Sequence, residues 1–196
     1  MWLACEDTLP SNIFLPPCLT AAVVQVSSES SYVLTVRERC TMVSPYISTS
    51  VIESAVGLVI VKAGEIRNAM TVSFYSEVAH HPTALWISIA KSSFTHELLR
   101  QQPEFTLAVL NQNQTNIANT CGSVSGRDQD KCSFLDLYQT PQGFLFLPGA
   151  LASTSARVRD SVDLGEHTLF IANILETELE SSTSHLRQLL LSDLKT

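Results

Sequence analysis

The sequence predicts a mainly β protein, an antiparallel barrel with a few short helices, on three observations. From about residue 51 onward, apolar residues alternate with polar ones or form short continuous runs, which is the pattern of β-strands. Successive strands are joined by tight turns, without the regular strand–helix alternation of a doubly wound sheet. The chain also lacks a GxGxxG motif, which argues against a Rossmann nucleotide fold.

The composition fits one compact domain. The chain has 196 residues, of which 45% are hydrophobic and 16% charged, enough for an ordinary buried core.

The net charge is −7 and the basic residues are scattered, so neither nucleic acid nor an anionic membrane is an expected partner. No apolar run approaches the roughly 20 residues that span a bilayer. The N-terminus lacks a basic signal region, so we expect a cytoplasmic protein.

No metal site is expected. The five cysteines form no CxxC pair and leave an odd one over, which favours reduced, buried thiols over a zinc site or a disulfide framework. His80 and His81 are adjacent, but no third ligand is recognisable, so a solvated turn is the better interpretation.

The N-terminal part differs in composition from the rest. Residues 1–41 contain no lysine or glycine and hold three of the eight prolines. Only 21–26 and 32–36 resemble strands, which predicts either a flexible extension or added edge strands. The main domain then covers residues 42–196, and Met42 is a candidate alternative start.

The first strands of the domain form a hairpin. Residues 57–62 (GLVIVK) are a buried strand, 63–65 a turn and 66–74 the returning strand. After a turn at 80–82, residues 84–90 form the most apolar strand, and we expect it to lie centrally in the sheet.

Two short helices follow. The first has Ser92 or Ser93 as its N-cap and Arg100 in its last turn, and it stops before Pro103; His96 is expected at its surface. A strand at 105–110 precedes a second helix at 114–120, with Gly122 as the residue after its C-cap. Residues 125–131 are a polar loop.

The last third predicts a strand, a long hairpin and a terminal helix. The strand covers 143–147, and the hairpin pairs 150–162 with 167–179 through a turn in which Gly165 can take a positive φ. Four leucines then recur at helical spacing, which predicts a C-terminal helix used for packing or dimer contact: Leu186, Leu189, Leu190 and Leu194.

At 68–73 and at 88–96, the end of a predicted strand runs into small hydroxyl residues. Backbone N–H groups at a helix N-terminus, helped by Ser and Thr hydroxyls, hold phosphate without many charged side chains. On this pattern alone, Ser92 and Thr95 are more simply explained as helix caps.

Four segments in order carry a family resemblance: RNAMTVS, SIAKSSFTHELL, SGRDQDK and DLGEHTLFIANI. Together they resemble the flavin reductase-like family, whose domain is an FMN-binding split barrel, over about residues 51–180. This chain departs from the family pattern at His80-His81-Pro82, where an acidic residue and two prolines are common, and at Cys132-Ser133. It also lacks the helix that many members carry before the first strand.

The resemblance implies a set of site residues. The residues expected along the isoalloxazine edge and ribityl chain are Asn68, Ala69, Met70, Thr71, Val72 and Ser73. Those expected at the ribityl chain and phosphate are Ala90, Lys91, Ser92 and Thr95. Arg127, with Lys131 near it, is expected to close on the FMN phosphate or to receive the pyridine nucleotide. His167 is expected to face the nicotinamide.

The resemblance also implies a function: an NAD(P)H-dependent FMN reductase, with FAD as another flavin, that supplies reduced flavin to a monooxygenase. A homodimer with the flavin near its interface is expected. No catalytic side chain is required, because the cofactor performs the hydride transfer. Consistently, the chain has no GxSxG elbow and no carboxylate pair in a motif context.

Two other functions remain open. The first is an electron-transfer module that keeps FMN bound and receives electrons from a protein. The second is a split-barrel oxidase acting on a small molecule such as a pyridoxamine phosphate. That activity would need converging phosphate-binding arginines, which the sequence does not show.

Overall fold

The computed structural model describes residues 53–183 and 185–194. The predictions for 1–41, for the strands at 21–26 and 32–36, for Met42 and for the first three cysteines lie outside these residues. The described elements are, in order, β1 Gly57–Ala63, β2 Ile66–Val72, β3 Tyr75–His80, β4 Thr83–Ala90, α2 Phe94–Gln101, β5 Glu104–Val109, α3 Thr115–Ser123, η1 Lys131–Phe134, β6 Tyr138–Gln139, β7 Leu145–Phe146, β8 Ala152–Asp163, β9 His167–Leu179, η2 Ser181–Thr183 and η3 Leu191–Leu194.

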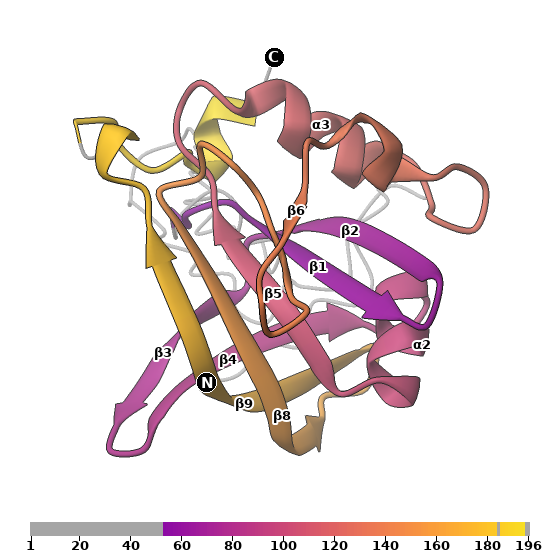
Figure 1. Cartoon of the computed structure of the whole chain (residues 1–196). Helices are drawn as coiled ribbons and strands as arrows, with labels where there is room; N and C mark the ends of the chain where they lie inside the picture. Colours follow the sequence, from indigo (N-terminus) through magenta and orange to yellow (C-terminus); the bar gives the residue numbers. More distant parts are fainter. Residues whose placement is uncertain (1–52, 184, 195–196) are drawn as a thin grey trace, which may run out of the picture. The chain divides into compact units, whose positions relative to one another are not determined.

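Seven strands form one antiparallel sheet in the order β2-β1-β5-β8-β9-β4-β3. Its two edges, β2 and β3, are consecutive in the chain, and the sheet curves strongly between them (Figure 1). Near this junction the Ser88 N–H donates to the carbonyl of Phe74 at 2.9 Å. The small β6–β7 hairpin is a separate sheet. The predicted fold class, a mainly antiparallel split barrel with a few short helices, is confirmed.

Both predicted hairpins are present. In the first, the pairing runs from Gly57 with Val72 to Ala63 with Ile66, and Gly64 turns with a φ of 60°. The longer β8–β9 hairpin turns through Gly165 at a φ of 85°, which confirms the positive φ expected there.

Two apolar cores lie on the two faces of β1 and β5. Val59 and Leu107 belong to one core, which α2 also packs against, whereas Leu58 and Ala108 belong to a second core together with residues of α3 and η1. A strand that is buried on both faces reads as a continuous apolar run, which is why GLVIV shows no alternation. In Figure 1, α2 and α3 lie on opposite sides of the β1–β2 hairpin.

The structure corrects the prediction around β3. The returning strand ends at Val72 instead of residue 74, and β3 is a separate strand that the sequence did not suggest. Most of its residues are exposed because it lies at the sheet edge, so no buried face marks it in the sequence. It also displaces β4, predicted to be central, to the position next to the edge, between β9 and β3.

Two further boundaries differ. Helix α3 continues to Ser123, so Gly122 lies inside the helix and not after its cap. There it faces β2, where a Cβ at Gly122 would lie 3.4 Å from the Cβ of Thr71. The strand expected over 143–147 shortens to Leu145–Phe146.

The predicted C-terminal helix is wrong. Leu189 is fully buried, its N–H donates to the Leu110 carbonyl at 2.8 Å, and its own carbonyl accepts from the Val56 N–H at 2.7 Å. Gln188 and Leu190 form isolated bridges to Asn111 and Ala55. The segment is therefore extended and joins two strand ends, and within the described residues it is followed by the 3₁₀ turn η3.

Candidate functional site

Most of the predicted site residues come from four segments that meet. These are β2, the end of β4 with the start of α2, the loop at 125–130 and the start of β9. Ala90 pairs with His167, Asn68 contacts Thr95, and Arg127 contacts Ser92. Residues far apart in the sequence are thus brought to one region around the N-terminus of α2.

Asn68 lies beneath the loop. Its Nδ2 donates to Thr95 Oγ1 at 2.8 Å, and both side chains are buried. The loop backbone at Gly126 lies so close that a Cβ there would overlap Asn68 Oδ1 and come within 2.7 Å of its Cγ. Asn68 Oδ1 is buried and has no hydrogen-bond partner. An unpaired buried acceptor is costly, and a hydroxyl or N–H of a ligand could satisfy it.

The N-terminus of α2 is capped by Ser93. Ser93 Oγ accepts from the His96 N–H at 3.2 Å and donates to the Ala90 carbonyl at 2.8 Å. The first N–H groups of a helix have no intrahelical partner, so this end attracts an anion. The neighbouring Ser92 does not cap the helix; it is exposed, and its hydroxyl is available to a ligand.

Arg127 bridges the loop to α2. Its Nη1 donates to the Ser92 carbonyl at 3.2 Å, and its Nη2 lies 3.0 Å from Glu97 Oε2. The guanidinium carbon also lies 5.3 Å from the centre of the Phe94 ring. A guanidinium therefore lies beside the anion-attracting end of a helix, which is a combination suited to a phosphate.

Lys91 is held by an ion pair. Its Nζ lies 2.6 Å from Asp163 Oδ1, and its backbone N–H donates to the Glu166 carbonyl at 2.9 Å. The hydrogen bond from Lys91, followed by that from the Gly165 N–H, lowers the pKa of Asp163. Lys91 thus ties the end of β4 to the β8–β9 turn.

His167 begins β9 beside the end of β4. Its ring lies edge-on to that of Phe74, with the centroids 6.2 Å apart, and its side chain is 30% exposed. Phe74 is itself 42% exposed. The two rings therefore form a partly open aromatic corner next to Ala90.

Most β2 side chains are not free for a ligand. Ala69 and Val72 are buried in the two cores, Met70 packs against one of them, and Thr71 Oγ1 donates to the Ala118 carbonyl at 2.6 Å. Ser73 follows the strand and is half-buried. Because β2 is an edge strand, its outward N–H and C=O groups are what it can offer.

Lys131 lies apart from this group. It is 3% exposed, and its amine donates to the carbonyls of Cys121 and Val124, each at 3.0 Å. Burial lowers its pKa. The structure therefore places Lys131 at the base of the loop, where it fixes the backbone and does not extend toward Arg127.

The expectation that His96 is a surface residue is wrong. Its side chain is 7% exposed, its Nε2 lies 2.9 Å from Thr168 Oγ1, and its ring packs at 5.6 Å from that of Phe170. Its pKa is lowered from 6.5, first by burial and then by the charges of Arg100 and Lys91. His96 therefore links α2 to β9, and its surroundings disfavour the charged form of its ring.

This burial predicts a pH-dependent stability. As the pH falls below the unfolded-state pKa of 6.5, the unfolded chain takes up a proton at His96 before the folded chain does, so the free energy of unfolding decreases. We expect His96→Gln to reduce the slope of stability against pH between about pH 7 and pH 5. Urea unfolding at several pH values measures it, and an unchanged slope would contradict the assignment.

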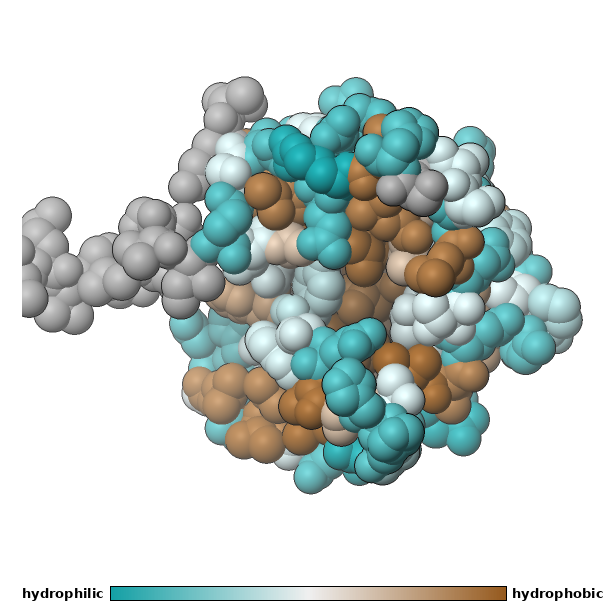
Figure 2. All heavy atoms as spheres, turned by 90° about the vertical axis from the view of Figure 1, so that its left-hand side faces the viewer, coloured by the Kyte–Doolittle hydropathy of each residue, from teal (hydrophilic) through white to brown (hydrophobic). Residues whose placement is uncertain are grey.

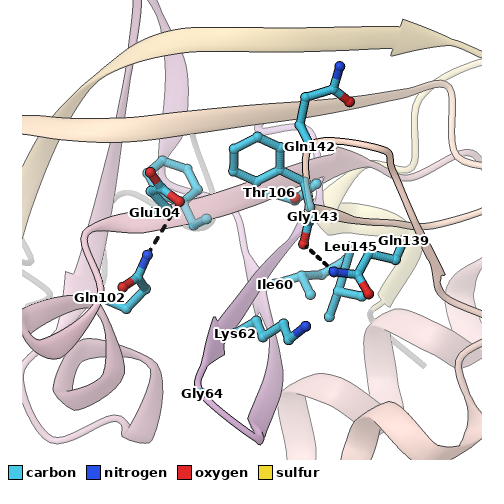
Figure 3. A pocket seen from close by; sticks show the side chains of 12 residues that line it. Ile60, Lys62, Gly64, Gln102, Glu104, Thr106, Gln139, Gln142, Gly143 and Leu145 are labelled. Carbon is cyan, nitrogen blue, oxygen red and sulfur yellow. Dashed lines mark hydrogen bonds between the residues drawn. The ribbon is translucent and has the colours of Figure 1, made fainter.

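Two hollows lie near these elements. The larger, about 350 Å³, is formed by β1, β5 and the β6–β7 hairpin, and contains no predicted site residue (Figure 3). Its Lys62 and Glu104 come from the two strands, and Gln139 bonds to the carbonyl of Gly143. The second, about 330 Å³, lies between the β1–β2 turn and the loop and includes Arg127. Only the second adjoins the site.

Over 53–183 and 185–194, no group of three or more His, Cys, Asp or Glu side chains is arranged to hold a metal ion. Within the same residues, no helix is both long and apolar enough to cross a bilayer.

Sequence reasoning missed three residues at the site. Glu97 contacts Arg127, Asp163 contacts Lys91, and Phe74 contacts His167. The partners of the two ion pairs are 30 and 72 residues apart, so no local spacing connects them. Only the fold could reveal these contacts.

Comparison with known proteins gives consistent matches. A family model described as a flavin reductase like domain matches residues 49–193. The reductase component of an FADH(2)-dependent resorcinol hydroxylase from Rhizobium sp. is 28% identical over 117 residues, which cover 59% of this chain and 64% of that protein. A high molecular weight rubredoxin from Moorella thermoacetica is 25% identical over 121 residues, covering 61% and 53%. The chain spans between about half and two thirds of the length of these relatives.

A solved structure shares the fold. The FMN-binding protein from Thermus thermophilus, crystallised with p-hydroxybenzaldehyde, superimposes with a TM-score of 0.66 at 23% identity. The match covers 70% of this chain and 78% of that one.

Proposed function

The chain belongs to the flavin reductase-like family, and from that premise we propose that it is an NAD(P)H-dependent flavin reductase that uses FMN. The observation that carries the proposal is the contact of Arg127 with Ser92 at the N-terminus of α2. It combines a guanidinium, an exposed hydroxyl and a helix N-terminus, three features that favour a phosphate.

The residues present fit a flavin phosphate and its ribityl chain. Ser92 and Arg127 would hold the phosphate, and the unpaired Asn68 Oδ1 would accept from a ribityl hydroxyl. Thr95 would act through Asn68, since its hydroxyl already accepts from that amide. Backbone groups of β2 and Ser73 would line the ring edge. FAD remains the other flavin that this arrangement would accept, because its first phosphate is equivalent.

The proposed chemistry needs few side chains. A bound flavin supplies the hydride acceptor, so the chain has only to bind and orient the two nucleotides and to exclude water. His167, with Phe74 beside it, would hold the nicotinamide against the flavin. Lys131 is not part of this proposal, because both of its contacts are to backbone carbonyls.

Partners follow from the same proposal. The Rhizobium relative is named as the reductase component of a hydroxylase, which supports a flavin-dependent monooxygenase as the recipient of reduced flavin.

Figure 2 views the side of β3 and β9 and shows apolar surface around a hollow. On these strands Val78, Leu175 and Leu179 are exposed, and exposed apolar surface of this kind suits a homodimer. A pyridine-nucleotide-dependent reductase of this kind would work in the cytoplasm.

The match to a rubredoxin favours one other candidate, the electron-transfer module. Mixing the purified chain with FMN and NADH or NADPH, and following absorbance at about 340 nm, separates the two candidates. Nucleotide loss that depends on added FMN is expected for the reductase. A yellow protein that keeps its flavin and does not oxidise either nucleotide would overturn that function and favour the module.

His167→Ala tests the nicotinamide assignment. We expect the KM for the pyridine nucleotide to rise by about tenfold, because the ring that would flank the nicotinamide is lost, while the Kd for FMN changes less than about twofold. Steady-state kinetics and a flavin titration measure the two values. Equal weakening of both ligands would contradict the role given to His167.

A further inference from the structure

Resting on the proposed function, we propose that Glu97 sets how tightly the flavin phosphate is held. Its carboxylate occupies the place of an anion beside Arg127 and the N-terminus of α2. A phosphate must therefore compete with a charge that belongs to the chain itself, and the flavin exchanges as a substrate instead of remaining a fixed prosthetic group.

The contacts of Arg127 carry this inference. Among the residues that the structure describes, its guanidinium contacts the beginning of α2: the Ser92 carbonyl, the Phe94 ring and the Glu97 carboxylate. The Glu97 carboxylate is the one anion of the three, at 3.0 Å from Nη2. The two charged side chains are 46% and 51% exposed, so the pair can open without unfolding anything.

Glu97 also stands in the first turn of the helix. A negative charge there is stabilised by the helix dipole, as a phosphate would be. The Glu97 carboxylate thus interacts with both groups that attract the phosphate, the Arg127 guanidinium and the N-terminus of α2. A phosphate that displaces Glu97 from Arg127 still lies close to its charge, because the helix backbone fixes where that side chain can go. The repulsion therefore persists in the bound state.

Asn68 takes no part in this competition. Asn68 Oδ1 remains buried and without a partner beneath Gly126, and Glu97 does not serve it. A ligand hydroxyl or N–H at that point meets no internal competitor. Competition is thus confined to the phosphate, and binding of a flavin that lacks the phosphate should not depend on Glu97.

The effect should be moderate because the ion pair is exposed. Removing the charge of Glu97 should lower the Kd for FMN by about three- to tenfold at low salt, which is the range for one screened charge near the surface. The change should shrink as ionic strength rises, since exposed charges are screened within about 10 Å at 0.1 M salt.

The experiment compares the full chain with Glu97→Gln, titrating each with FMN and with riboflavin by quenching of flavin fluorescence at low and high salt. We expect FMN to bind more tightly to the variant and riboflavin to bind equally to both. Glu104→Gln is the matched control, because it removes a carboxylate from another ion pair, with Arg157, outside the site. It should leave both affinities unchanged.

A double variant tests whether the effect of Glu97 depends on its ion pair with Arg127. In an Arg127→Gln background, adding Glu97→Gln should tighten FMN by less than in the unmodified chain, since the shared partner is gone. The inference is overturned if Glu97→Gln leaves FMN affinity unchanged or weakens it, or if it tightens riboflavin as much as FMN. Riboflavin binding to the unmodified chain shows that a flavin site exists whatever Glu97 does. Failure to bind either flavin would instead overturn the proposed function.

Discussion

Leu189→Ala is expected to lower the free energy of unfolding by about 2–5 kcal/mol, although the residue lies only seven positions from the end of the chain. Its side chain is fully buried in the core that contains Leu110 and Val56. Its backbone also bonds to both of these residues, so truncation leaves a cavity where the terminal segment joins two strands. Urea unfolding monitored by circular dichroism measures the loss.

The neighbouring leucines make this a test of the corrected structure. A helical stripe would bury Leu186, Leu189 and Leu190 alike, whereas the extended segment buries only Leu189 fully and leaves the other two partly exposed. Leu186→Ala should therefore cost clearly less. Leu179→Ala, at a side chain that is 74% exposed, should change stability by less than about 0.5 kcal/mol. Equal losses at Leu186 and Leu189 would favour the helix.

The same leucines show where sequence patterning reaches its limit. The hairpins were predictable because Gly64 and Gly165 mark turns and the flanking strands have a buried face. The terminal segment was not, because spacing alone cannot say whether an apolar residue faces a helix groove or a gap between strands. The conformation is decided by the backbone groups next to β1 and β5, at Val56 and Leu110, which need hydrogen-bond partners and find them in an extended Leu189. Strand β3 was missed for the converse reason, since an edge strand with an exposed surface has no period to detect.

The site was predictable in a different sense. Four motifs in order sufficed to state the family, and the family match confirms it. The fold then brings Asn68, Ser92, Thr95 and Arg127 into one group through direct contacts, while Lys131 falls outside it. A motif places a lysine in a loop but does not say whether its amine reaches solvent or the carbonyls at the loop base. That depends on the path of the backbone from Cys121 to Val124.

Gly126→Ala is expected to weaken FMN binding strongly. A methyl group there would overlap Asn68 Oδ1 and lie 3.0 Å from Phe94 Cδ1, and Asn68 cannot move aside easily because it is buried and bonded to Thr95. The loop would have to lift, and Arg127 would move away from Ser92 with it. We expect FMN affinity to fall by more than about tenfold and the free energy of unfolding by about 1–3 kcal/mol. Flavin titration and urea unfolding measure the two effects.

Control variants separate the overlap with Asn68 from a general effect of adding a methyl group to a glycine. Gly126 is not among the glycines with positive φ, so the substitution should act through space and not through backbone strain. Gly126→Ala combined with Asn68→Ala removes the overlapping atoms and should recover part of the stability lost, although not the affinity if Asn68 contacts the flavin. Gly122→Ala, inside α3 and with its nearest contact at 3.4 Å, should stabilise the helix by up to about 1 kcal/mol. If Gly126→Ala bound FMN normally, the loop would not need to lie against Asn68, and Arg127 could not owe its position to that contact.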